Sequence, residues 1–129
     1  MTFARTDDVQ DAIPGNELIE GGLLGALIFD NRNVALVAER LRPEHFQIRL
    51  YGRIYAAICV MADRGDEVTP LTLKMALAND DDLTAEGGVQ CLLRLGFLGP
   101  QVSHPDSYAE TVILLHQRRQ LLALGQDIQ

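Results

Sequence analysis

The stretch HPDSYAETVILLHQRRQLLAL, residues 104–124, predicts the longest helix of the chain, roughly 30 Å at about 1.5 Å per residue. Ser103 and Asp106 resemble a capping box, with Asp in place of the usual Glu, and would begin this helix near His104. Its apolar side chains extend beyond one face and comprise Tyr108, Val112, Ile113, Leu114, Leu115, Leu121, Leu122 and Leu124. One small domain cannot easily cover so much apolar surface. The helix therefore predicts a contact with another protein, unless the helix before it covers the whole surface.

Three helices are predicted in the first half of the chain. No segment there shows the alternation of apolar and polar residues that is typical of a strand. The first covers residues 16–29 and has Asn16 as its N-cap. The second is capped by Asp30 or Asn31 and ends before a proline. The third ends at Gly65, and one of its faces presents Tyr51, Ile54, Tyr55, Ile58 and Ala62.

Two further helices are predicted before residue 101. Thr69 is a good N-cap and Pro70 fits the first turn, where a missing N–H costs nothing, so a helix should run from there to about Asn79. The acidic run at residues 80–82 is expected to be a solvated loop. The next helix should begin near residue 84 or 85 and end at the glycines before residue 101, with a buried face formed by Val89, Leu92 and Leu93.

Gly21, Gly22 and Gly25 form a stripe on the first predicted helix, because they are three and four residues apart. Each glycine costs about 1 kcal/mol relative to alanine inside a helix. We expect the close approach of another helix to offset this cost, and simple crowding inside one core is the alternative.

Composition and charge argue against several classes of function. The net charge is −7 and the basic residues form no stripe, so we expect no direct tight binding of nucleic acid by this domain. The only lysine, Lys74, does not follow a glycine-rich phosphate loop. The three histidines lack the spacing of a metal site, and the two cysteines are expected to be reduced thiols. We therefore expect no catalytic residue, no metal site and no cofactor in this chain.

The same composition predicts an all-α fold. Hydrophobic residues make up 47% of the chain but aromatic residues only 5%, which favours helix packing with a core of Leu, Ile, Val and Ala. The longest near-apolar run, residues 21–29, is too short to cross a membrane, and no signal peptide is recognisable. We expect a cytoplasmic protein without membrane contact.

The order of these signals resembles the amino-terminal domain of bacterial DnaB-type replicative DNA helicases, over residues 14–128. The first two matches are Pro14, Asn16, Glu20, Leu24 and Gly25, and then Leu41, Pro43, Glu44 and Phe46 followed by Ile54, Tyr55 and Ala57. The later matches are Val68 to Leu77, Gly87 and Gly88 with Leu92, and Tyr108, Ala109, Val112, Arg119, Leu121, Leu122, Gly125 and Ile128. Gly21 and Cys91 stand where the family often has Gln and Tyr, which indicates a divergent member.

The resemblance implies a compact globule of about six helices followed by a helical hairpin. A flexible arm would occupy residues 1–13, the globular core with the first hairpin arm residues 14–100, and the long second hairpin helix residues 101–129, leading toward a linker. Hairpins would pair subunits into dimers, three dimers would form a hexameric ring, and the ring would dock primase. ATP and magnesium would bind only in a separate downstream motor domain.

The predicted function is thus a non-catalytic collar domain that assembles helicase subunits. The residues predicted to form the self-association or partner surface are Leu92, Leu98, Tyr108, Val112, Leu115, Arg119 and Leu122. A phage or mobile-element adaptor with the same fold and no motor is the main alternative, and the coding sequence after Gln129 would distinguish the two. A helix-turn-helix DNA binder is disfavoured by the charge, and a small helical enzyme would need a site that the sequence does not contain.

Overall fold

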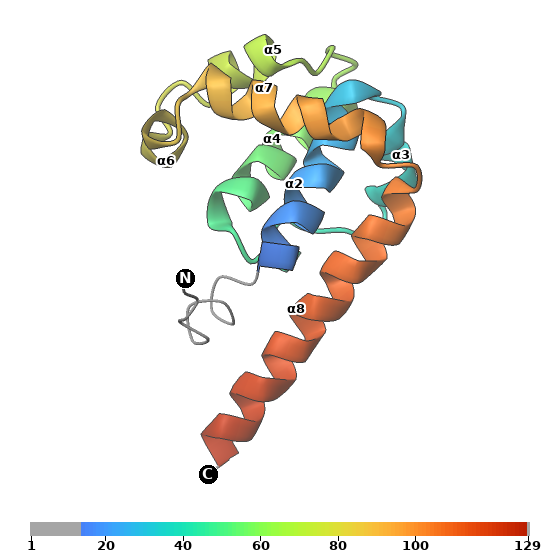
Figure 1. Cartoon of the computed structure of the whole chain (residues 1–129), viewed down its shortest axis with the longest axis vertical. Helices are drawn as coiled ribbons and strands as arrows, with labels where there is room; N and C mark the ends of the chain where they lie inside the picture. Colours follow the sequence, from blue (N-terminus) through green and yellow to red (C-terminus); the bar gives the residue numbers. More distant parts are fainter. Residues whose placement is uncertain (1–13, 129) are drawn as a thin grey trace, which may run out of the picture.

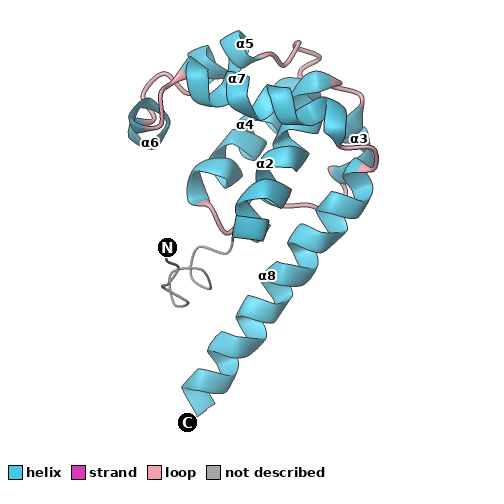
Figure 2. Cartoon of the chain, viewed as in Figure 1, coloured by secondary structure: helices cyan, strands magenta, loops and turns pink. Residues whose placement is uncertain are grey.

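The computed structural model describes residues 14–128, and within this range it contains helices and no strand (Figures 1 and 2). The expected all-α class is confirmed, with seven α-helices among the described residues where about six were expected. They are α2 (Pro14–Phe29), α3 (Asn33–Val37), α4 (Arg49–Asp63), α5 (Pro70–Ala76), α6 (Asp81–Ala85), α7 (Val89–Leu98) and α8 (Pro105–Ile128). Two short 3-10 helices, η2 (Pro43–His45) and η3 (Gly99–Gln101), connect them. The expected arm at residues 1–13 lies outside the described residues.

The core is built around α2, which lies in the middle of the globule (Figure 1). Every residue of α2 from Glu20 to Ile28 is buried, and Leu23, Leu24 and Leu27 are completely inaccessible. A helix that is apolar on all sides must be surrounded, and α7, α8 and α4 all pack against it. The second helix of the core, α4, buries Ile54, Tyr55 and Ile58, as its expected face required.

Helices α7 and α8 do not lie along each other, so the hairpin expected from this pair is not formed by the described residues. The buried face of α7, which includes Cys91, Leu92 and Leu95, packs on α2 and α5 instead. After η3 the chain turns, and α8 passes α2 and α3 before it leaves the globule as a projecting rod (Figure 1). The contact of α7 with α2 decides this geometry, because it already occupies the apolar face that a hairpin would need.

Several helix ends differ from the expectations. Asn16 is not an N-cap, because α2 begins two residues earlier at Pro14. The acidic run is not a loop: the Asp80 carboxylate accepts a hydrogen bond from the Leu83 N–H and caps α6, whose first turn carries the next two aspartates. Gly87 and Gly88 have φ of +110° and +62° and separate α6 from α7, which therefore begins later than expected. Helix α8 starts at Pro105, so the residue directly before it is His104, one position later than the Ser103 that the expected box requires.

Two local expectations are confirmed. The Thr69 side chain accepts a hydrogen bond from the Thr72 N–H, and Pro70 occupies the first position of α5. Gly65, with a φ of +78°, follows the C-cap of α4. Its N–H donates to Ala62 and the next N–H donates to Met61, which is the hydrogen-bond pattern of a Schellman motif.

Candidate protein interface

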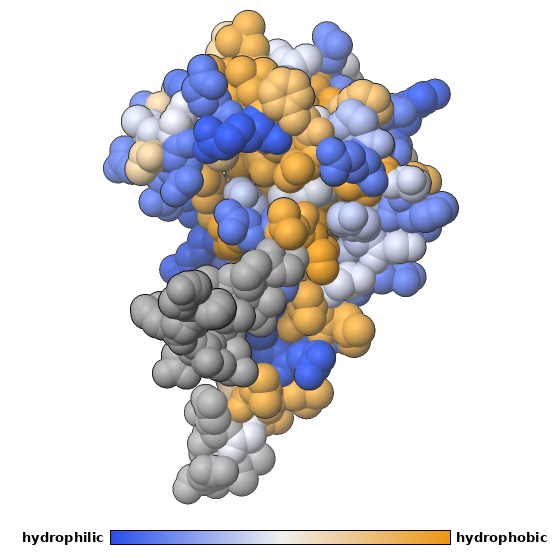
Figure 3. Space-filling model, in the orientation of Figure 1, coloured by the Kyte–Doolittle hydropathy of each residue, from blue (hydrophilic) through white to orange (hydrophobic). Residues whose placement is uncertain are grey.

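The outer part of α8 is a rod with exposed leucines. Residues 121–125 are all exposed, and Leu114, Leu121, Leu122 and Leu124 keep between 57% and 68% of their surface accessible. Figure 3 shows this apolar surface along the projecting part of the molecule. Successive residues on a helix are about 100° apart. Leu114 and Leu121 are seven residues apart, nearly two full turns, so they lie on the same side of α8. We call the four leucines the α8 leucine face.

Most of the residues expected to form the association surface lie outside this face. Val112 and Leu92 are buried in the core and offer no surface to a partner. Tyr108, Leu115 and Arg119 are half-buried on the side of α8 that meets the globule, and Leu98 is half-buried on α7. Of the seven residues in that prediction, only Leu122 is largely exposed. The spacing in the sequence placed Tyr108, Val112 and Leu115 on one side of the helix, but in the structure that side covers the globule and leaves Leu114 and Leu121 outside.

The glycine stripe of α2 lies where other helices approach most closely. A methyl group on Gly25 would lie 2.0 Å from the Leu95 carbonyl oxygen, and one on Gly21 would lie 3.2 Å from the Leu95 side chain. A methyl group on Gly22 would lie 3.1 Å from the ring of Tyr108. The neighbours are α7 and α8 of the same chain, so the glycines allow these helices to pack on α2.

A buried carboxylate joins α2 to the loop before α4. Glu20 is only 2% exposed, and its carboxylate accepts hydrogen bonds from the N–H groups of Gln47 at 2.7 Å and Ile48 at 3.1 Å. Burial raises the pKa of Glu20, while the two hydrogen bonds and the Arg119 guanidinium act in the opposite direction. Asn16, one turn earlier on α2, is also buried and donates to the side chain of Gln47. These contacts hold the loop that α8 lies against.

The same loop is bonded to α8. The Arg119 guanidinium donates to the backbone carbonyl of His45 at 3.1 Å, and the His45 ring lies 5.0 Å from that of His116. The Nδ1 atom of His45 accepts the Arg42 N–H at 2.9 Å. Burial lowers the pKa of His45, and the neighbouring His116 lowers it further. We call Glu20, His45, His116 and Arg119 the α8 junction, because they fix the direction in which α8 leaves the globule.

Sequence reasoning did not identify this junction, since its members are far apart in the chain. The hydrogen bond from Arg119 to His45 spans 74 residues and that from Gln47 to Glu20 spans 27. From the sequence, Glu20 was identified only as part of the first family match. Its position directly before the near-apolar run at residues 21–29 was the available signal that it needs specific partners.

The described residues show no arrangement typical of a metal site. Among the side chains of residues 16–125, no group of three or more His, Cys, Asp or Glu is placed to hold a metal ion. Cys91 is buried and Cys59 half-buried, and burial raises the pKa of both thiols. No helix of the described part of the chain has the length and apolar character needed to cross a bilayer.

Comparison with known proteins identifies the family of this all-helical domain. A family model described as the DnaB-like helicase N terminal domain matches residues 12–113. The chain is 33% identical over 116 residues to the replicative DNA helicase DnaB of Rickettsia bellii, which covers 90% of this chain and 23% of that protein. It is 31% identical over 127 residues to the replicative DNA helicase DnaC of Bacillus subtilis, covering 95% of this chain and 28% of that protein.

A solved structure is similar as well. The crystal structure of the N-terminal domain of DnaB helicase from Mycobacterium tuberculosis matches with a TM-score of 0.78 and 27% sequence identity. The match covers 86% of this chain and 80% of that chain. The chain spans only about a quarter of the length of the relatives named above.

Proposed function

Because the chain belongs to the DnaB-like helicase N-terminal domain family, we propose that it is the non-catalytic collar domain of a replicative DNA helicase, in which subunits associate through α8. The observation that supports this role most directly is the exposed α8 leucine face. The parent protein would be an ATP-dependent DNA helicase that acts in DNA replication. ATP and magnesium would bind in its motor domain and not in the residues described above.

The energetics favour association but predict a weak dimer. Burying one leucine side chain fully is worth about 1.5–3 kcal/mol, so completing the burial of each half-exposed leucine should contribute about 1–2 kcal/mol. An antiparallel pair of α8 helices would bury eight such leucines, four from each copy. The gain, on the order of 10 kcal/mol, is similar to the estimated entropic cost of association. Further contacts in the parent protein would then be needed for a stable hexamer.

Leu121→Asp tests the proposed association, because Leu121 is 68% exposed and lies in the middle of the α8 leucine face. The matched control is Ala123→Asp, an equally charged change at an exposed residue about 200° further round the helix. We expect light scattering to show a concentration-dependent dimer for the wild type and for Ala123→Asp, and a monomer for Leu121→Asp with unchanged helical content. A dimer that persists in Leu121→Asp, or a wild type that stays monomeric at millimolar concentration, would contradict the proposal.

Docking of primase is the second part of the proposed function, and family membership supports it. Primase from the same organism should migrate with the domain in size-exclusion chromatography. The Leu121→Asp variant distinguishes primase docking on the dimer from docking on a single copy. If primase requires the dimer, that variant loses both dimerisation and docking. If primase binds one copy, docking persists in the monomeric variant. Separate migration of primase and the wild-type domain would exclude this part.

A further inference from the structure

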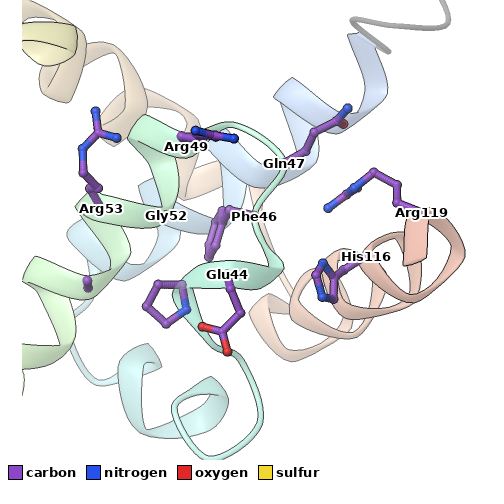
Figure 4. Close-up of a pocket in the computed structure, with 10 residues that line it drawn as sticks. Glu44, Phe46, Gln47, Arg49, Gly52, Arg53, His116 and Arg119 are labelled. Atoms are coloured by element: carbon purple, nitrogen blue, oxygen red, sulfur yellow. The ribbon is translucent and has the colours of Figure 1, made fainter. Parts of the chain in front are cut away.

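A second surface lies on the globule between the η2 loop, the amino end of α4 and the side of α8 (Figure 4). It is a hollow of about 610 Å³ with an apolar floor that includes Pro43, Phe46 and Gly52. Gly52 makes the floor compact, since a methyl group there would lie 2.6 Å from the Pro43 carbonyl oxygen. The hollow is separate from the α8 leucine face, and none of the four leucines lines it.

The rim of the hollow is rich in positive charge. Arg49 and Arg53 extend from α4, while His116 and Arg119 face them from α8 (Figure 4). Three of the eleven basic residues of the chain thus gather around one hollow, in a protein whose net charge is −7. The only carboxylate in the lining is that of Glu44.

The arginines of the rim differ in how far their charge is already neutralised. Arg53 is bound to Asp80 at 2.7 Å and to Asp82 at 2.6 Å, so its charge is compensated. Arg119 donates to a backbone carbonyl and lies near the buried Glu20. Among the side chains that the structure describes, residues 16–125, no carboxylate lies at ion-pair distance from Arg49, which is exposed. Arg49 is therefore the guanidinium best placed to accept a new anionic partner.

The amino end of α4 adds to the positive potential. Arg49 is the first residue of this 15-residue helix, and the N-cap, Ile48, has no side chain that can accept a hydrogen bond. The aligned peptide dipoles place about half a positive charge at this end of the helix. The Glu20 carboxylate accepts hydrogen bonds only from the N–H groups of Gln47 and Ile48, which precede the first residue of α4. The helix dipole and the Arg49 side chain thus favour the same kind of ligand.

We propose that this hollow binds a short acidic segment of a protein partner, with an apolar side chain on the Phe46 floor and carboxylates at Arg49 and Arg119. A guanidinium can bind a carboxylate through two parallel hydrogen bonds, and the apolar floor gives the ligand a second point of contact. A nucleic-acid strand fits less well, because its charge would extend beyond the hollow along a protein whose net charge is −7. The proposal does not depend on dimerisation through α8 or on primase.

Fluorescence anisotropy with the 129-residue chain tests the proposal. The probe is a fluorescein-labelled octapeptide of alternating glutamate and leucine, and the controls are a lysine–leucine octapeptide and a single-stranded oligonucleotide. We expect the acidic peptide to bind, with an affinity that falls as salt rises, while the lysine peptide does not bind. In amide NMR spectra, the Gly52 signal should shift as the acidic peptide is added.

Two charge-reversal variants show whether binding occurs in the hollow. Arg49→Glu should weaken binding of the acidic peptide about tenfold. Arg64→Glu makes the same change in charge at the opposite end of α4 and should leave the affinity nearly unchanged. If Arg49→Glu lowers the helical content, Arg49→Gln replaces it and should weaken binding in the same direction. Equal loss in Arg49→Glu and Arg64→Glu would overturn the proposal, as would oligonucleotide binding that depends on Arg49 when the peptide does not bind.

Discussion

Replacing Gly25 with alanine should destabilise the domain, although alanine is the better helix former. In the interior of a helix the change from glycine to alanine alone stabilises by about 1 kcal/mol. At this position, however, the new methyl group would lie 2.0 Å from the Leu95 carbonyl oxygen and 3.0 Å from the Gly99 backbone nitrogen. Ordinary contacts begin near 3.4 Å, so the backbone of α7 would have to move by more than 1 Å relative to α2.

The size of the effect follows from what must move. Excess volume in a packed core costs about 1–3 kcal/mol when side chains can adjust, and occasionally more. Here the obstacle is backbone, and α7 carries the buried Leu92 and Leu95 with it. We expect a net loss of about 3 kcal/mol, a large share of the roughly 5–15 kcal/mol that stabilises a typical domain. The melting temperature should fall by about 10 °C.

Urea unfolding followed by circular dichroism measures this loss, with Gly96→Ala as the matched control. Gly96 lies inside α7, and a methyl group there would meet only the Ile28 side chain at an ordinary 3.9 Å. The control should therefore gain up to about 1 kcal/mol, as helix propensity alone predicts. If Gly25→Ala were as stable as the wild type, the close packing of α2 on α7 could not be the reason for glycine at this position.

Three other changes test the polar contacts. Glu20→Gln should cost about 1–3 kcal/mol in urea unfolding, because the amide accepts one loop N–H and turns its own donor toward the other; unchanged stability would show that the carboxylate does not hold the loop. Tyr55→Phe should cost about 1 kcal/mol, since the hydroxyl donates to the Leu41 carbonyl at 2.9 Å. Tyr51→Phe should be nearly neutral, because no hydrogen bond joins its hydroxyl to residues 14–128, and equal losses in both variants would refute the assignment. Folding lowers the pKa of His45 below its ordinary value of 6.5, so the unfolded chain takes up the proton first on acidification. The wild type should therefore lose more stability than His45→Gln between about pH 7.5 and about pH 5.5, and equal losses would exclude this origin.

The features that could be predicted from the sequence depend on neighbouring residues. The cap at Thr69 and the stop at Gly65 act within a few positions of the chain, so residue type and spacing are sufficient to identify them. The prediction that the acidic run is a loop was wrong for a related reason. An aspartate can cap a helix or remain in a loop, and residue type alone does not distinguish the two. The Asp80 hydrogen bond to the Leu83 N–H and the ion pair with Arg53 show which of these the fold contains.

The sequence by itself determined that the chain is all-α, that its longest helix lies near the carboxyl end, and that this helix carries more apolar surface than one small domain covers. Periodicity specifies how residues are arranged around one helix, because the backbone geometry is fixed. Only the tertiary structure decided that Val112 is buried in the core while Leu114 and Leu121 are exposed, and that Glu20, His45 and Arg119 meet where α8 leaves the globule. Those outcomes depend on where α2, α7 and the η2 loop lie in space, which is set by packing between residues far apart in the chain.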